Sequence, residues 1–210
     1  MDRRLTLFLL FTIVIVLLFW YSSVLQEQFY VVVKIFDAIV LENRSLAIGV
    51  FVLAAAVAAL ISPLTNIPLV PIAVAIWGPS FTTAILLCGW FIGDILAYVI
   101  GRYVGRKAVS YFVPEERLER WSSTVKEHTN IITAFFLRLA LPAELGYAFG
   151  IVRYHAGWYI LITVLAELPF AVVATYASEA VLSGDVIKFF WFTAILFLLI
   201  FFAFFKIRKK

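Results

Sequence analysis

The longest uncharged stretch constrains this chain most. Forty-eight consecutive residues, Leu46 to Gly93, contain no Lys, Arg, Asp, Glu or His. A helix rises about 1.5 Å per residue and crosses the membrane hydrocarbon in roughly 20 residues, so this stretch is too long for one span. Its middle, Ser62–Pro71, contains prolines, which remove backbone donors and interrupt helices. Irregular backbone at membrane depth must be surrounded by protein or a water-filled cavity, so we expect a membrane protein whose broken segment carries function.

Composition agrees with a membrane protein. Of the 210 residues, 64% are hydrophobic and only 14% are charged, whereas about 25% are charged in soluble domains. The net charge of +4 mostly reflects topology, because the basic residues cluster at the chain ends and in one loop. We expect anionic lipid headgroups rather than nucleic acid as a partner. Cys88 is the single cysteine, and we find no metalloprotease, nucleophile-elbow or Walker motif. We therefore expect no enzyme activity, no cofactor and no metal site.

The positions of the basic residues predict which apolar segments cross the membrane. If both halves of the uncharged stretch crossed, the six basic residues of 102–126 would lie outside, against the positive-inside rule. They lie inside if 46–78 enters the membrane and returns to the same side. The same argument makes 131–152 re-entrant, because otherwise the basic tail at 206–210 would end outside. The termini are then both cytoplasmic.

The predicted fold is an all-α polytopic membrane protein with four full spans and two opposed re-entrant hairpins. The expected spans are 5–22, 79–100, 156–181 and 189–205. Residues 1–45 would hold the first span and an interfacial helix, residues 46–181 the core with both hairpins, and residues 182–210 the last span and a basic tail.

The two hairpins suggest an inverted repeat. Each half has a proline, a closing glycine and a carboxylate at spacings that differ by one residue. The matched residues are Pro71, Gly78 and Asp94 in the first half, and Pro142, Gly150 and Glu167 in the second. Interrupted segments at corresponding places in two halves indicate a transport site at the repeat interface. Chance similarity is the alternative.

Four charges lie in apolar surroundings: Asp94, Arg138, Glu144 and Glu167. Each costs about 2.5–3.5 kcal/mol at the centre of a membrane helix, so each must pair, face water or bind a ligand. One interpretation is a structural ion pair of Arg138 with Glu144 or Asp94. The other is that the forked guanidinium of Arg138 binds a lipid phosphate, which a nearby carboxylate releases or couples.

Three stretches carry a family resemblance. They are Ile67–Pro71 with Trp77-Gly78, then Gly93–Arg106 with its Gly-Arg-x-x-Gly pattern, and finally Phe136–Gly150 with an Arg, a Pro and a closing Gly. In this order they resemble the DedA family, also called VTT-domain or SNARE-associated Golgi-type membrane proteins. The resemblance implies a fold of two opposed re-entrant hairpins and the movement of lipids across bilayers. Bacterial members are linked to undecaprenyl phosphate or other phospholipids, often with proton coupling, and eukaryotic members to scrambling.

The residues depart from the family pattern in two places. Bacterial members carry acids in the first hairpin, whereas positions 46–93 have none, and Asn66 is the nearest polar substitute. An arginine of the second hairpin is replaced, with Glu144 near its place. Energy-independent scrambling, or coupling through other acids, therefore becomes the expectation.

The candidate site residues fall into three groups. The predicted substrate-binding residues are Asn66, Pro68, Pro71, Arg138, Pro142, Glu144 and Gly150. The predicted coupling or gating residues are Asp94, Glu144 and Glu167. The predicted headgroup or loop contacts are Arg102, Arg106 and Lys107.

The leading functional hypothesis is a flippase or scramblase for a lipid with an anionic phosphate headgroup, in a prokaryotic plasma (inner) membrane. The second is an ion- or proton-coupled small-solute transporter in which Asp94 and Glu167 bind a cation. The third is a non-transporting membrane assembly factor whose loop 102–126 docks a partner. The sequence leaves the lipid, the energy source and homo-oligomer formation open.

Overall fold

The computed structural model describes residues 34, 38–40, 43–61, 66–111, 113–127, 130–141 and 144–208, with the side chains of 127 and 204–208 excepted. The chain divides into two units, residues 1–47 and residues 48–210. The expected first span, most of the expected interfacial helix, Pro142 and the last two tail lysines lie outside the described residues. The second unit contains most of the described residues.

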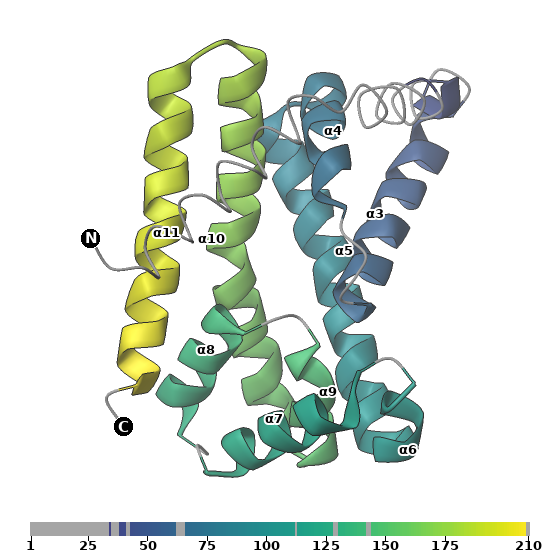
Figure 1. Ribbon diagram of the computed structural model, residues 1–210. Helices are drawn as coiled ribbons and strands as arrows, with labels where there is room; N and C mark the ends of the chain where they lie inside the picture. Colours follow the sequence, from purple (N-terminus) through teal and green to yellow (C-terminus); the bar gives the residue numbers. More distant parts are fainter. Residues whose placement is uncertain are drawn as a thin grey trace. The chain divides into compact units, whose positions relative to one another are not determined.

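The described residues of this unit form helices joined by turns (Figure 1). In chain order they are α3 (Arg44–Leu60, which begins in the first unit), the 3-10 turn η1 (Ile67–Leu69), α4 (Val70–Trp77), α5 (Pro79–Val99), the π-helical turn η2 (Ile100–Val104), α6 (Arg106–Val109), α7 (Glu115–Glu127), α8 (Ile131–Ala140), α9 (Leu145–Ile151), α10 (Ala156–Leu182) and α11 (Val186–Arg208).

Within the described part of the chain, three helices are long and apolar enough to cross a membrane: α5 with η2, α10, and α11 from Val186 to Ala203. Helix α10 lies between the other two and contacts both. The large apolar side chains of α11 are mostly exposed, as expected for a surface that faces lipid. These helices match the last three predicted spans.

The segments predicted to be re-entrant are short and interrupted. After α3 the chain passes through η1 into α4, which has only eight residues, and α8 and α9 have ten and seven. At about 1.5 Å per residue, none of these three helices reaches across a bilayer. Asn130 starts α8 by accepting a hydrogen bond from the backbone N–H of Ile132 at 2.9 Å.

The glycines expected to close the two hairpins have different roles. Gly78 adopts a φ of 77° between α4 and α5, a conformation that glycine adopts without strain. Gly150 instead lies inside α9. In the second predicted hairpin region, the residue with a positive φ is Arg153, at 56°. Gly150 thus serves close helix packing rather than a left-handed turn, and its closing role in the second hairpin stays a prediction.

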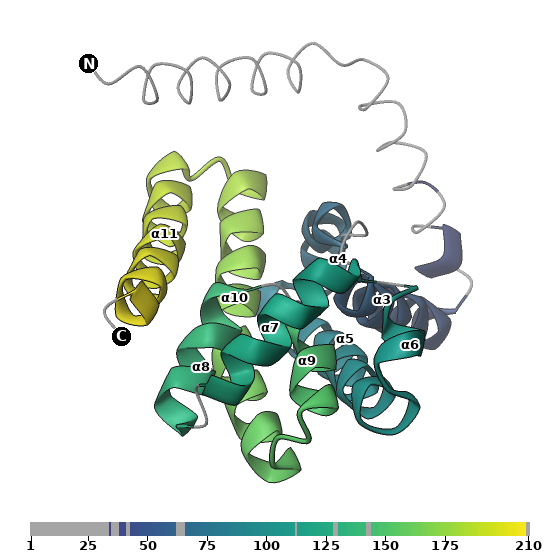
Figure 2. The same ribbon diagram turned by 60° about the horizontal axis from the view of Figure 1, so that its bottom comes forward.

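Glycines allow α3 and α9 to pack closely against α5. A Cβ at Gly93 would collide with the backbone oxygen of Ala56 on α3, and a Cβ at Gly150 would collide with the carbonyl oxygen of Tyr98 on α5. Small residues allow such close backbone contact between membrane helices. Figure 2 shows α7 lying across the end of the bundle, where it contacts α9. Leu118, Trp121 and Val125 of α7 join the same buried cluster as Tyr147 and Phe149 of α9.

Candidate functional site

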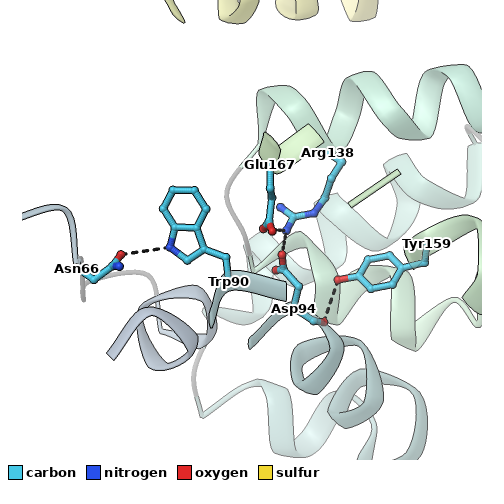
Figure 3. Close-up of polar contacts among 6 residues, drawn as sticks. All are labelled: Asn66, Trp90, Asp94, Arg138, Tyr159 and Glu167. Atoms are coloured by element: carbon cyan, nitrogen blue, oxygen red, sulfur yellow. Dashed lines mark hydrogen bonds and ion pairs between the residues drawn. The ribbon is translucent and has the colours of Figure 1, made fainter. Parts of the chain in front are cut away.

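Three buried charges from three helices meet in the second unit. Arg138 of α8 donates from its Nη2 nitrogen to Asp94 Oδ2 of α5 and, at 2.9 Å, to Glu167 Oε1 of α10 (Figure 3). Arg138 is 5% exposed, Asp94 0% and Glu167 8%, so water screens these contacts little. We call Asp94, Arg138 and Glu167 the buried triad.

Tyr159 supports the triad from α10. Its hydroxyl donates to the backbone oxygen of Asp94 at 2.9 Å, and its ring stacks on Tyr98 with the ring centres 4.6 Å apart. Gly146 of α9 leaves room for this hydroxyl, since a Cβ there would lie 2.6 Å from it. The position of α5 at Asp94 is thus fixed by α9 and α10 together.

A cavity of about 250 Å³ adjoins the triad and is partly open to the outside of the protein. Its polar lining comes from Asn66, Trp90, Arg138 and Glu167, and the rest of the lining is apolar, including Ala58, Ala59 and Phe170. One water occupies about 30 Å³ of the liquid, so the space accommodates several waters or a small polar headgroup.

Asn66 has a defined orientation in this cavity. Its Oδ1 accepts a hydrogen bond from Trp90 Nε1 at 3.2 Å, and the indole N–H can only donate. The amide NH₂ must therefore point elsewhere. Asn66 is 4% exposed, and its Nδ2 makes no hydrogen bond to any described residue.

The other predicted substrate-binding residues lie apart from this lining. Pro68 is in η1 and Pro71 is in the first turn of α4, where a missing N–H is tolerated. Glu144 is buried at the start of α9, and Gly150 packs against α5. None of these four is among the described residues that line the cavity.

The predicted loop contacts lie at the α6–α7 end of the bundle. Arg102 donates to the Tyr98 hydroxyl at 2.6 Å and to the Tyr154 backbone oxygen at 3.4 Å. Arg106 forms an ion pair with Glu119 of α7, and Lys107 is exposed. Arg102 thus has a structural partner, and the headgroup role of all three stays a prediction.

The comparisons with known proteins bear on this arrangement. A family model described as VTT domain matches residues 52–180, more than half of the chain and all three triad residues. The chain belongs to the VTT-domain family. It is an integral membrane protein of this family, also called DedA, whose members are often linked to lipid transport. Comparisons with curated proteins and with solved structures found no match.

Two residues of this VTT-domain protein were not singled out as site residues from the sequence, although spacing gives a signal for both. Trp90 precedes Asp94 by four positions on α5, so the two lie on one helix face. Tyr159 precedes Glu167 by eight positions on α10, which is about two turns. A search for polar or aromatic residues one or two turns from each buried acid would have found them.

Proposed function

We propose that this protein moves a phosphate-bearing lipid, such as undecaprenyl phosphate or a phospholipid, between membrane leaflets as a flippase or scramblase. The observation that supports this most is a buried guanidinium beside a mostly apolar cavity with a few polar lining residues, within helices whose outer surfaces are apolar. Guanidinium groups suit phosphate because they offer several N–H donors in a fixed plane. Membership of a family often linked to lipid transport supports the same assignment.

The proposed path leads through the cavity. A headgroup enters it from one leaflet while its acyl chains stay in the surrounding lipid. Asp94 and Glu167 hold Arg138 in place when the cavity holds no headgroup, and the phosphate competes with them for the guanidinium. The headgroup then leaves toward the other leaflet, and the carboxylates regain Arg138.

The direct test is lipid exchange in reconstituted vesicles. Purified protein is placed in liposomes that contain a phospholipid with a fluorophore on its acyl chain, and an impermeant quencher reports the fraction in the outer leaflet. We expect faster exchange between leaflets than in protein-free liposomes made in parallel. Exchange at the protein-free rate would contradict the proposal.

A cation transporter is the second candidate, because two carboxylates meet one guanidinium in the triad. Such a protein would carry ions or small solutes through the same cavity. Ion flux measured in the same vesicles, without lipid exchange, would favour it.

We further propose four spans and two opposed re-entrant hairpins in a prokaryotic plasma membrane, with both termini cytoplasmic. The shortness of α4, α8 and α9 supports re-entry. In a Cys88→Ser background, Ser110→Cys and a tag after Lys210 should react with an impermeant reagent from the same side. Ser183→Cys, in the turn between α10 and α11, should react only from the opposite side. Labelling of Ser110→Cys and the tag from opposite sides would contradict this topology.

A further inference from the structure

The Gly-Arg-x-x-Gly pattern of the sequence lies in the π-helical turn η2 and ends at the residue after it. The backbone N–H of Gly105 donates to the backbone oxygen of Ile100, five residues earlier, at 3.0 Å, and π-helical turns of this kind often occur at functional sites. A Cβ at Gly101 would collide with the backbone oxygen of Tyr147, so this glycine lets α9 approach. The pattern thus shapes the backbone around its one charged side chain, Arg102.

Arg102 holds the turn between α9 and α10 against α5. Its guanidinium donates to the Tyr98 hydroxyl at 2.6 Å and to the backbone oxygen of Tyr154 at 3.4 Å, and the Tyr98 hydroxyl donates to the same oxygen. The residue before Tyr154, Arg153, has a φ of 56°, a left-handed conformation that is strained for residues other than glycine. Such a conformation persists only where surrounding contacts hold it, and Arg102 and Tyr98 supply contacts of this kind one residue away.

Tyr98 connects Arg102 to the buried triad. Its ring stacks on the ring of Tyr159, with the ring centres 4.6 Å apart and the ring planes at 18°. The Tyr159 hydroxyl donates to the backbone oxygen of Asp94 at 2.9 Å (Figure 3). Both tyrosines are buried, and Phe149 of α9 packs on Tyr159 with 5.5 Å between the ring centres. These contacts form a continuous path from half-buried Arg102 to Asp94, and closely packed groups transmit a displacement along such a path.

We propose that Arg102 is a positioning residue, which sets the position of Asp94 in the buried triad through the two stacked tyrosines. The inference rests on the proposed function and names a residue that controls the same site from outside the cavity lining. Asp94 competes with the phosphate for Arg138 along the proposed path, so its position decides how readily the guanidinium is released and regained. A functional group keeps its geometry only when the groups around it are held, and the loss of Arg102 loosens both tyrosines. Arg102 thus acts through the protein rather than by contact with the headgroup.

The test measures the exchange of acyl-labelled phospholipid, per folded protein, in liposomes that contain the full chain. We expect Arg102→Ala to slow exchange about fivefold, a typical coupling for residues of one hydrogen-bond network. Tyr159→Phe keeps the stacked ring and removes the hydroxyl that holds Asp94, and we expect it to slow exchange by a similar factor. Tyr176→Phe is the matched control on the same helix, because its hydroxyl contacts Ser80 at 3.1 Å, outside this path, and it should keep the wild-type rate.

A double variant separates positioning from two other roles of Arg102. Arg102→Ala combined with Tyr159→Phe should slow exchange no more than either substitution alone, because both interrupt one path. A direct contact between Arg102 and the headgroup would be independent of Tyr159, and the two effects would then multiply to about 25-fold. A role in stability alone would lower the thermal midpoint in detergent and leave the rate per folded protein unchanged.

The outcomes distinguish this inference from the proposed function. If the wild-type protein exchanges no lipid, the proposed function fails, and the inference that rests on it fails as well. If the wild-type protein exchanges lipid but Arg102→Ala is equally fast per folded protein, the function stands and the inference is overturned. Multiplied effects in the double variant, or a loss of rate in Tyr176→Phe as large as that in Tyr159→Phe, would also overturn it.

Discussion

Arg138→Ala is expected to reduce lipid exchange to the rate of protein-free vesicles. The substitution removes the guanidinium and leaves the carboxylates of Asp94 and Glu167 buried without a cation. Removing one partner of a buried ion pair costs about 3–5 kcal/mol, so we also expect a lower unfolding temperature in detergent. Exchange is measured with acyl-labelled phospholipid, and unfolding by the loss of helical circular dichroism.

A second substitution separates function from stability at this position. Arg138→Lys retains the charge that neutralises the carboxylates but not the planar fork that binds phosphate. We expect it to recover most of the stability and little of the exchange. Arg120→Ala, at an exposed arginine of α7, is the control and should change neither. A folded Arg138→Ala protein that exchanges lipid at the wild-type rate would rule out the proposed role of Arg138.

Gly150→Ala is expected to produce the second large effect, a loss of stability. The added Cβ would collide with the backbone oxygen of Tyr98 and lie 2.8 Å from the backbone nitrogen of Arg102. Backbone atoms of α5 and η2 cannot turn aside as a side chain can, so α9 must shift. Overpacking of a close contact costs about 1–3 kcal/mol, and we expect the thermal midpoint in detergent to fall accordingly.

Gly49→Ala provides the matched control, because a Cβ at Gly49 in α3 would meet nothing within 4 Å. It should leave the midpoint unchanged or raise it, since alanine favours the helix. An equal loss of stability in both variants would show that helix–helix contact at Gly150 is not the cause.

Hydropathy and charge predicted the long helices well. Helix α10 runs from Ala156 to Leu182, against a predicted span of 156–181, because an apolar stretch of that length has few alternatives. The same uncharged stretch also predicted the interruption before α4 and the turn at Gly78, since proline and glycine act on the local backbone. These features depend on neighbours in the sequence.

The triad depends on the packing of distant segments and was predicted only in part. The cost of burying Arg138 indicated that it needs partners, and Asp94 was one of two suggested for an ion pair. Glu167 contacts Arg138 because α8 packs against α10. No local sequence pattern determines how these two helices pack. The role of Gly150 was not predictable for the same reason. The sequence alone does not distinguish a glycine in a turn from a glycine that allows a neighbouring helix to pack closely.

The most direct test of this account is to obstruct the cavity. In a Cys88→Ser background, Ala58→Cys places a thiol on the cavity lining, and a bulky thiol reagent is attached before reconstitution and verified by mass. Ser110→Cys, labelled in the same way at an exposed site, is the control. We predict that labelling stops lipid exchange by the Ala58→Cys protein and leaves that of the Ser110→Cys protein unchanged. Full exchange by the labelled Ala58→Cys protein would show that headgroups do not pass through this cavity.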